Sequence, residues 1–374
     1  MKKNALLIVA AVLAVALTAC GNPAASGDDK AEKVDNVDSH AKEVFDKFNE
    51  MSGSERTDAL IAAAQEEGEI SIYTSNTDLD AIVDAFDEAY GIDVNVYRGN
   101  SESVLQRVLQ ESKAGFAGVD LIETNSGELN ILAEEGLLYP YSSELRDAVR
   151  EEGQKEFWTA DRFNAFVVAW NTDLVSDDQV PASIEEFADP KWAGKVSMEL
   201  GDVDWFSAMW NYYLDAGKSE DEVQAMFEGI AANSKVVKGH TVQAELLSAG
   251  EFAAGVSLYS HSVQEGTEEG RPIEWRGDSV EPVQPVVLRP NGGGLVGTAQ
   301  HPAAALLFMD FLLSAEGGQR AIADEFRIGS VPGGNDPLAG LETVQVDEDE
   351  MLDNIEKWDE LYAAIIQGGE ITEE

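Results

Sequence analysis

The stretch Gly68 to Asn76 constrains the fold of this chain more than any other, because it combines a helix end, a buried strand and a polar loop. Apolar residues at helical spacing precede Gly68, and glycine commonly follows the last turn of a helix. The run Ile70 to Tyr73 is rich in β-branched and aromatic residues, as strands are. The amphipathic stretch Leu79 to Tyr90 then follows. This order predicts the first βα unit of an α/β domain.

Loops that follow parallel strands lie at the carboxyl edge of an open α/β sheet, where ligands bind. Two further predicted strands, Ile92 to Tyr97 and Gly118 to Thr124, also end in polar loops that open helices. The first ligand-contact candidates therefore come from three successive strand ends: Tyr73, Ser75, Asn76, Ser101, Glu102, Asn125 and Ser126. Ordinary helix capping by Ser and Asn explains any single loop as well. Only the coincidence of three favours the functional interpretation.

A second lobe is predicted after Phe163 to Thr172, which has the Val, Phe and Trp content of a central strand. The strand Val196 to Leu200 follows, and then an acidic, aromatic loop before the helix Phe206 to Leu214. That loop supplies the candidates Asp202, Asp204 and Trp205. The alternative is that both aspartates only stabilise the positive end of the helix.

Tyr259 and His261 alternate with Leu258 and Ser260 at strand spacing, so we expect both side chains on one face. Shared ligand contact and a satisfied core pair explain this spacing about equally well. Asn291 to Gly294 is glycine-rich, but no Gly-Lys-Ser/Thr follows it as a P-loop would require. We interpret it as a flexible segment between the lobes.

The N-terminus is typical of an exported protein. Lys2 and Lys3 precede the apolar run Ala5 to Leu17, which is short for a membrane span, and small residues flank Cys20, the only cysteine of the chain. Leu17 to Cys20, Leu-Thr-Ala-Cys, resembles a bacterial lipobox, which implies cleavage before Cys20 and a lipid anchor on its thiol. Residues 1–19 are thus predicted to be a signal peptide, and 20–55 a lipidated tether with a short helix.

The charge of the chain is strongly negative, with 25 Lys and Arg against 71 Asp and Glu and a net charge of −46. Nucleic acid is excluded as a partner, because phosphate binding requires a basic face and no Lys/Arg cluster follows residue 20. Hydrophobic residues make up 44% of the chain, which indicates a folded body with acidic surfaces.

Three pieces of the sequence resemble the ferric-iron-binding group of ABC-transporter solute-binding proteins. They are Leu60 to Ser75, Phe187 to Lys195 with its Asp-Pro-Lys-Trp, and Ala299 to Gln319 with its His-Pro-Ala-Ala. The resemblance implies an α/β fold of two Rossmann-like lobes joined by crossing hinge strands, the type II periplasmic-binding-protein fold, with a ligand cleft between the lobes. It implies lobe 1 at 56–168, lobe 2 at 169–288, and a return to lobe 1 with C-terminal helices at 289–374.

The same resemblance bears on the ligand. His240, which lies in the family's cleft-facing loop, joins the ligand candidates, although a capping role is equally compatible with the sequence. Iron-binding members carry consecutive tyrosines where this chain has Tyr259 and Ser260. An iron site would have to use Glu102, Tyr259 and His261, an incomplete set for ferric iron. We therefore expect a small organic solute or an oxyanion and no cofactor, with ferric iron as the alternative cargo.

The predicted function is that of an extracellular solute-binding lipoprotein, a monomer that delivers a small solute to ABC permease subunits at the outer face of the cytoplasmic membrane, or on the periplasmic side of an envelope membrane. A secreted enzyme is disfavoured, because no nucleophile elbow, His-Glu-x-x-His helix or cysteine nucleophile is present in the sequence. A solute sensor on the same fold stays open as a weaker alternative.

Overall fold

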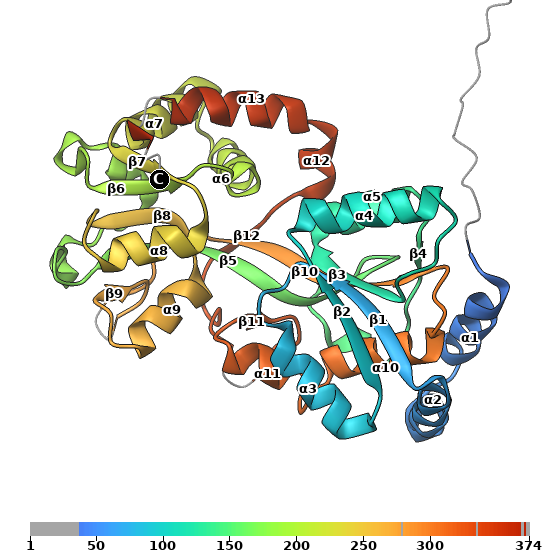
Figure 1. Ribbon diagram of the computed structural model, residues 1–374. Helices are drawn as coiled ribbons and strands as arrows, with labels where there is room; N and C mark the ends of the chain where they lie inside the picture. The colour runs from blue at the N-terminus through green and yellow to red at the C-terminus, as the bar shows by residue number, and fades with distance from the viewer. Residues whose placement is uncertain (1–36, 278–279, 334–335, 368–369, 372–374) are drawn as a thin grey trace, which may run out of the picture. The chain divides into compact units, whose positions relative to one another are not determined.

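A computed structural model describes residues 37–277, 280–333, 336–367 and 370–371 of the chain (Figure 1). In this part of the chain, thirteen strands form one mixed sheet with the central order β13-β7-β6-β8-β5-β10-β3-β1-β2. The strands are β1 Glu69–Thr74, β2 Asp93–Arg98, β3 Leu121–Asn125, β4 Leu138–Tyr139, β5 Thr159–Asn171, β6 Val196–Glu199, β7 Ser234–Val237, β8 Ala254–Tyr259, β9 Ile273–Glu274, β10 Val286–Val296, β11 Ile328–Gly329, β12 Thr343–Gln345 and β13 Glu370–Ile371.

Two long antiparallel strands, β5 and β10, join the two halves of the sheet. β10 pairs with β3 on one side and with β5 on the other. The second half of β5 pairs with β8. Side chains of β5 alternate between two hydrophobic clusters, with Phe163 and Val167 in one and Phe166 and Trp170 in the other. Both faces of β5 are buried, which is why this strand reads as a continuous apolar run.

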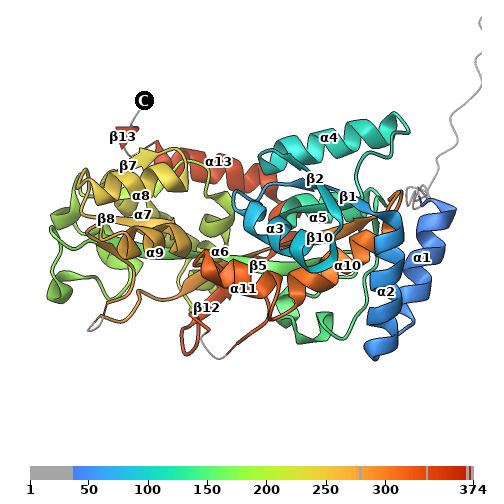
Figure 2. The same ribbon diagram turned by 60° about the horizontal axis from the view of Figure 1, so that its bottom comes forward.

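Lobe 1 consists of β1 to β4 and the helices around them. These helices are α1 Ser39–Asn49, α2 Gly53–Glu67, α3 Leu79–Tyr90, α4 Ser101–Lys113, α5 Ser126–Glu134, α10 Pro302–Leu313 and α11 Gly318–Asp324. Side chains of α4 and α5 pack with Tyr73 and Ile122 on one face of the sheet. Side chains of α1, α2, α3 and α10 pack with Ile70 and Ile72 on the other face (Figures 1 and 2).

Lobe 2 consists of β6 to β9, β13 and helices on both faces of these strands. Its helices are α6 Val203–Asp215, α7 Glu220–Ala232, α8 His240–Ser248, α9 Ser260–Glu268 and α13 Ile355–Ile366, and α12 Glu348–Asp353 leads into α13. Trp358 and Tyr362 fix α13 in the core beside Phe206 of α6. Short 3₁₀ helices lie at Arg146–Ala148, Glu151–Gly153, Asp177–Gln179, Ile184–Ala188 and Pro190–Trp192.

Several predicted elements are confirmed. The helix before β1 ends at Gly68, which adopts φ of 78°, and α3 has the predicted bounds Leu79–Tyr90. The predicted fold of two lobes joined by crossing strands is also confirmed. The short helix expected in the tether is α1, whose Phe45 and Phe48 are buried in the cluster shared with α10. The predicted lobe boundaries stay predictions.

Two local predictions are wrong because helices begin earlier than expected. Asp204 and Trp205 belong to the first turn of α6 and do not form a loop. His261 lies in the first turn of α9, so the alternation with Tyr259 at strand spacing ends at Tyr259. α9 begins directly after β8, whereas only Leu200 to Asp202 separate β6 from α6, so neither helix is preceded by a long loop.

The interpretation of Asn291 to Gly294 as a flexible segment is wrong. These residues lie inside β10 and are buried between β3 and β5. A Cβ at Gly292 would lie 2.3 Å from the Thr159 carbonyl oxygen, and one at Gly293 would lie 2.4 Å from Met309 Sδ. The glycines therefore serve close packing of the hinge strands and of α10, where no side chain fits.

Among the described residues, no helix has both the length and the apolar character that a membrane crossing requires. The predicted signal peptide, Cys20 and most of the predicted tether lie outside the described residues.

Replacing Gly292 by alanine should lower the urea midpoint of unfolding, because the new methyl group forces β5 and β10 apart. We expect a loss of about 3 kcal/mol, typical of overpacking a buried site. Gly333→Ala is the matched control, since a Cβ there meets nothing within 4 Å. Equal midpoints for the two variants would contradict the close-packing role of Gly292.

Candidate functional site

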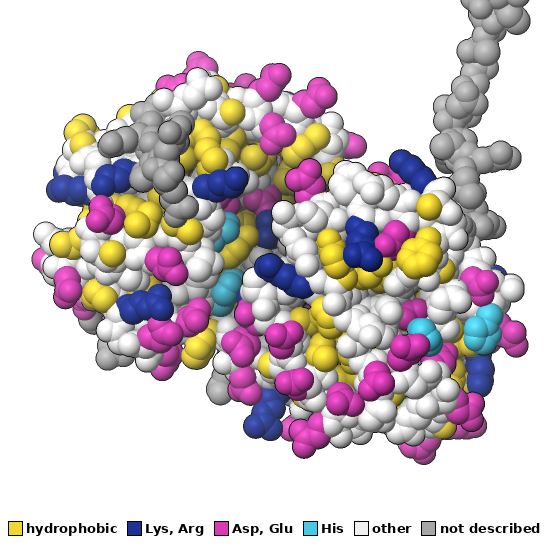
Figure 3. All heavy atoms as spheres, viewed as in Figure 1, with side chains coloured by type: hydrophobic (Ala, Val, Ile, Leu, Met, Phe, Trp, Pro, Cys, Tyr) yellow, Lys and Arg dark blue, Asp and Glu magenta, His cyan; other side chains and the backbone are white. Residues whose placement is uncertain are grey.

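The loops after β1, β2 and β3 meet lobe 2 at a pocket of about 330 Å³, called here the cleft pocket. Its lining comes from both lobes and from the hinge strands: Ser75, Asn76, Thr77, Arg98, Asn100, Ser101, Asn125, Arg162, Asn164, Gly239, His240, Thr241, Val242, Tyr259, His261, Ser262, Arg289, Asn291 and Arg327. In Figure 3, histidine and basic side chains gather along the hollow between the lobes, on a face that is otherwise rich in carboxylates.

Four guanidinium groups line the cleft pocket, and no carboxylate is among its described lining residues. Arg98 ends β2, Arg162 and Arg289 lie on the hinge strands, and Arg327 precedes β11. Amide and hydroxyl groups make up most of the remaining polar lining. A pocket lined this way offers many N–H and O–H donors, so a fitting ligand must supply acceptor oxygens.

Carboxylates outside the described pocket lining form ion pairs with three of these arginines. Arg162 forms ion pairs with Glu123 and Asp161, and its side chain is 3% exposed. Burial raises the pKa of Asp161 above its usual range, against the opposing effect of Arg162. These pairs fix the direction of the guanidinium, because a buried charge without a partner is costly.

The other two paired arginines are held in the same way. Arg289 is paired with Asp204, and Arg327 is paired with Asp78. The pocket is therefore rich in oriented donors, while much of its positive charge is already balanced by the carboxylates behind it.

His240 begins α8 directly after Gly239, whose φ of 94° turns the chain into the helix. The His240 Nε2 atom lies 3.0 Å from Asp202 Oδ1. Burial alone would lower the pKa of His240, but the Asp202 carboxylate outweighs it and raises the pKa above its ordinary value. His240 is thus biased toward the charged form near neutral pH.

The two other aromatic residues that line the pocket, His261 and Tyr259, carry no charge near neutral pH. Burial, followed by the nearby Arg327 and Arg162, holds the pKa of His261 well below its ordinary value. Burial raises the pKa of the Tyr259 phenol, which accepts a 2.9 Å hydrogen bond from Arg289. The ring of Tyr259 stacks between His240 and His261, with centroid distances of 3.6 and 5.3 Å.

One group of residues beside the pocket has the donor set of a metal site. Glu199, Asp202 and His240 each offer a ligand atom, and these atoms lie within 4.8 Å of one another. Glu199 Oε1 accepts a 2.7 Å hydrogen bond from the Gly239 amide. Asp202 Oδ2 and His240 Nδ1 are buried with no hydrogen-bond partner. Carboxylate and imidazole ligands suit transition metal ions.

The structure brings seven of the predicted ligand residues together in the cleft pocket: Ser75, Asn76, Ser101, Asn125, His240, Tyr259 and His261. Their role as ligand contacts stays a prediction. Asp202 and Asp204 do not line the pocket but hold His240 and Arg289 from behind. Ser126 is buried and donates its hydroxyl hydrogen bond to Glu348.

Three predicted residues lie away from the pocket. Tyr73 is buried, and its hydroxyl contacts Glu111 on the face of the sheet that α4 covers. Trp205 packs against Phe227 in the core of lobe 2. Glu102 is an exposed residue in the first turn of α4. The iron set of Glu102, Tyr259 and His261 is therefore not assembled in the pocket.

Sequence reasoning missed the four arginines, because they come from distant parts of the chain and form no cluster along it. It also missed Asn164 and Asn291 on the hinge strands. One signal was available: a charged or amide side chain inside a buried apolar strand requires a partner, and the hinge strands carry Arg162, Arg289 and Asn291.

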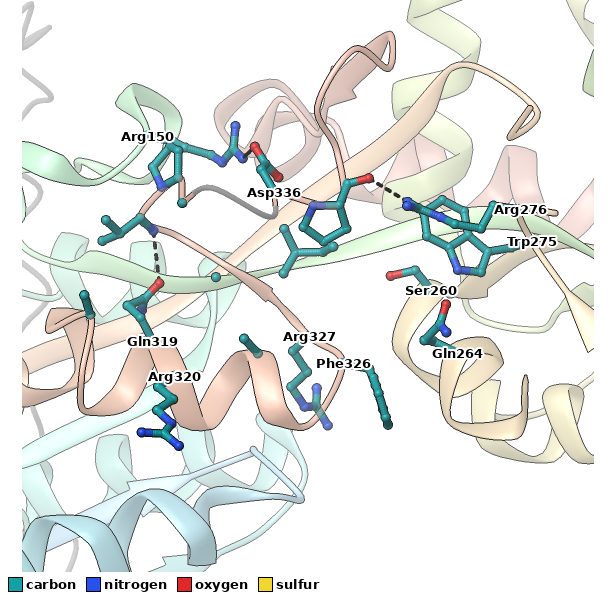
Figure 4. A pocket seen from close by; sticks show the side chains of 18 residues that line it. Arg150, Ser260, Gln264, Trp275, Arg276, Gln319, Arg320, Phe326, Arg327 and Asp336 are labelled. Atoms are coloured by element: carbon teal, nitrogen blue, oxygen red, sulfur yellow. Dashed lines mark hydrogen bonds and ion pairs between the residues drawn. The ribbon is translucent and has the colours of Figure 1, made fainter. Parts of the chain in front are cut away.

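A larger cavity of about 570 Å³ opens between α9, α11 and the segment near Pro337. Figure 4 shows Arg150 with Asp336 on one side of this cavity and Arg276 with Trp275 on the other. It shares Arg327 with the cleft pocket, but none of the predicted ligand residues lines it. The cleft pocket is the candidate site, because the strand ends of lobe 1 converge there.

Residues 73–319 match the family model described as bacterial extracellular solute-binding protein. The chain belongs to this family. The family match confirms the predicted resemblance, and all described lining residues of the cleft pocket except Arg327 fall within the matched residues.

Curated relatives of this solute-binding protein are named for iron. The chain is 24% identical over 301 residues to the Fe(3+)-binding periplasmic protein of Serratia marcescens, covering 76% of this chain and 87% of that protein. It is 27% identical over 274 residues to iron uptake protein A1 of Synechocystis sp., covering 67% of this chain and 72% of that protein. Both relatives are named for the binding or uptake of iron.

Solved structures share the fold of this solute-binding protein. Iron-bound HitA from Pseudomonas aeruginosa aligns with a TM-score of 0.66 at 18% identity, covering 79% of this chain and 99% of that one. AfuA from Actinobacillus pleuropneumoniae, with exogenous fructose-6-phosphate bound, aligns with a TM-score of 0.65 at 20% identity, covering 80% and 99%. The type II periplasmic-binding-protein fold is thereby confirmed.

The opposite pKa shifts of His240 and His261 can be tested by NMR titration of the histidine ring protons. His240 should titrate above the ordinary value of about 6.5 and His261 below it. Asp202→Asn should lower the pKa of His240, because the imidazolium then loses the carboxylate that stabilises it. His→Gln variants assign the signals. A pKa of His240 that does not respond to Asp202→Asn would contradict the ion pair.

Proposed function

We propose that this solute-binding protein captures ferric iron as a complex with an anionic, oxygen-rich ligand and delivers it to the permease of an ABC importer. The observation that carries the proposal is the lining of the cleft pocket, which presents four guanidinium groups and no carboxylate among its described residues. The names of the curated relatives support iron as the metal.

A bare ferric ion fits this lining poorly. It would meet the positive charges of the arginines, and the Tyr259 phenol keeps its proton near neutral pH, since burial raises its pKa. Ferric iron requires anionic oxygen ligands. In a complex, the accompanying ligand supplies these oxygens, and its outer carboxylates or phosphates accept hydrogen bonds from the guanidinium groups.

Glu199, Asp202 and His240 offer a second way to hold iron beside the pocket. Their ligand atoms lie close together, and His240 is the member that lines the pocket. Asp202 Oδ2 and His240 Nδ1 have no other partner, so this group could complete the coordination of an incoming complex, with the metal displacing a proton from His240.

An iron-free organic anion is the second candidate. The same donor-rich lining that binds an iron complex would bind a phosphate ester, and AfuA, which has the same fold, holds fructose-6-phosphate. This candidate retains the organic solute or oxyanion that the sequence predicted.

Thermal shift assays with ferric citrate, citrate, fructose-6-phosphate and orthophosphate separate the two candidates, since a ligand of the folded state raises the melting temperature. We expect the largest shift with ferric citrate. A large shift with fructose-6-phosphate and none with ferric citrate would favour the organic anion. No shift with any of the four would overturn the proposal.

Arg98→Gln should weaken binding of the stabilising anion by about tenfold or more, the size of a lost charge-assisted hydrogen bond. Arg98 is exposed and lies in no ion pair of the described residues, so its removal should leave stability unchanged. Arg271→Gln is the matched control, because Arg271 is exposed, lies outside the pocket and pairs with Glu269. Calorimetry that gave equal affinities for both variants would remove Arg98 from the site.

We also infer a monomer held by acyl chains on Cys20 at the outer face of the cytoplasmic membrane or on the periplasmic side of an envelope membrane. The lipobox-like Leu17 to Cys20 supports this anchor. Stable anchoring requires at least two acyl chains. Cys20→Ala should therefore move the protein from the membrane pellet to the soluble fraction and abolish labelling with radioactive palmitate. Full retention of the variant in the membrane would contradict the anchor.

A further inference from the structure

A carboxylate from the C-terminal part of the chain is buried behind the cleft pocket. Glu348, the first residue of α12, is 5% exposed. Its Oε1 atom accepts a hydrogen bond from the hydroxyl of Ser126, the first residue of α5. Its Oε2 atom lies 3.7 Å from the position of a Cβ built on Gly127. Glu348 therefore covers the first turn of α5, where free backbone amides and the helix dipole stabilise negative charge.

Glu348 also acts on Arg289, one of the four arginines of the pocket. Burial would lower the pKa of Arg289, but Tyr259, Asp204 and Glu348 together raise it well above its usual value. The guanidinium contacts Asp204 through Nη1 and the Tyr259 hydroxyl through Nη2. Arg289 is thus paired with Asp204 of lobe 2, while Glu348 of the C-terminal segment acts on it electrostatically from its place on Ser126, next to the lining residue Asn125.

The balance of charge around Arg289 limits what the pocket accepts. A ligand anion that reaches Arg289 gains the hydrogen bonds of the guanidinium, but it is repelled by Asp204 and Glu348 behind it. The repulsion grows with the charge of the ligand, while the number of hydrogen bonds that Arg289 offers does not. Asp204 pairs with Arg289 directly, whereas Glu348 accepts a hydrogen bond from Ser126. The charge of Glu348 can therefore be removed without breaking the Arg289–Asp204 pair.

We propose that Glu348 is a specificity-determining residue that sets the charge of the anion accepted by the cleft pocket. It weakens binding of a more negatively charged anion relative to binding of a less charged one. This inference rests on the proposed function only in requiring that the pocket binds anions. It does not depend on whether the anion carries iron.

The test is the ratio of affinities for citrate and succinate, measured by calorimetry at about pH 8 for the wild-type protein and for Glu348→Gln. Both probes are fully ionised there. Glu348 is largely charged as well, since burial raises its pKa to about 7. We expect Glu348→Gln to raise the affinity for citrate relative to succinate by about tenfold. Lost packing alone would weaken both probes and leave the ratio unchanged.

Two variants separate the charge of Glu348 from its hydrogen bond and from its helix. Ser126→Ala removes a hydrogen bond that lowers the pKa of Glu348, so the affinity ratio of this variant is compared with the wild type at about pH 9, where the carboxylate stays charged, and it should be close to that of the wild type. Asp349→Asn removes one carboxylate from the same turn of α12 at an exposed position, and it should leave the ratio unchanged too. A melting temperature for each variant shows whether the variant is folded.

An unchanged ratio in folded Glu348→Gln, with the wild-type protein binding the probes, would overturn the role of Glu348 and leave the proposed function intact. An equal increase of the ratio in Asp349→Asn would overturn it as well, because the effect would then be one of overall charge. Binding of neither probe by any variant would overturn the anion-binding function together with this inference.

Discussion

The pairing of β5 with β10 is the interaction on which the rest of this structure depends. The two strands cross between the lobes, carry Arg162 and Arg289 into the cleft pocket, and pair with the innermost strand of each lobe. Their close approach is possible only because Gly292 has no side chain where the Thr159 carbonyl lies. The same strands thus determine how the lobes are connected and where two of the four guanidinium groups lie.

A strongly acidic chain here contains a donor-lined pocket, and buried ion pairs make this possible. Glu123 and Asp161 pair with Arg162, and Asp204 pairs with Arg289, which keeps these two arginines oriented. The abundant carboxylates do not mark the site, because none is among the described lining residues of the pocket. Four arginines determine the chemistry of the pocket, although the chain as a whole carries a net charge of −46.

The fold could be predicted from the sequence because its signals are local. Gly68, the apolar run Ile70 to Tyr73 and the amphipathic stretch Leu79 to Tyr90 each follow from helical or strand spacing. Part of the site could be predicted for the same reason, since Ser75 directly follows β1, Asn125 ends β3, and Ser101 begins the helix after β2.

The remaining lining residues of the pocket come together through contacts between distant parts of the chain. Arg98 and Arg327 are 229 positions apart in the numbering and line one pocket because the chain returns to lobe 1 before α11. Trp205 was predicted to contact the ligand because of its acidic neighbours, yet helix α6 turns it into the core beside Phe227. The resemblance to iron-binding proteins placed Tyr259 and His261 correctly at the pocket but could not reveal that arginines surround them.

The first and the last helix of the described chain pack in different lobes. Helix α1 packs in lobe 1, whereas Trp358 and Tyr362 of α13 anchor the end of the chain in lobe 2 (Figure 1). Fluorescent labels on exposed residues of these two helices would therefore sit on different lobes, and both would be remote from the pocket lining. Energy transfer between them would report any ligand-dependent change in the distance between the lobes, without a label inside the binding site.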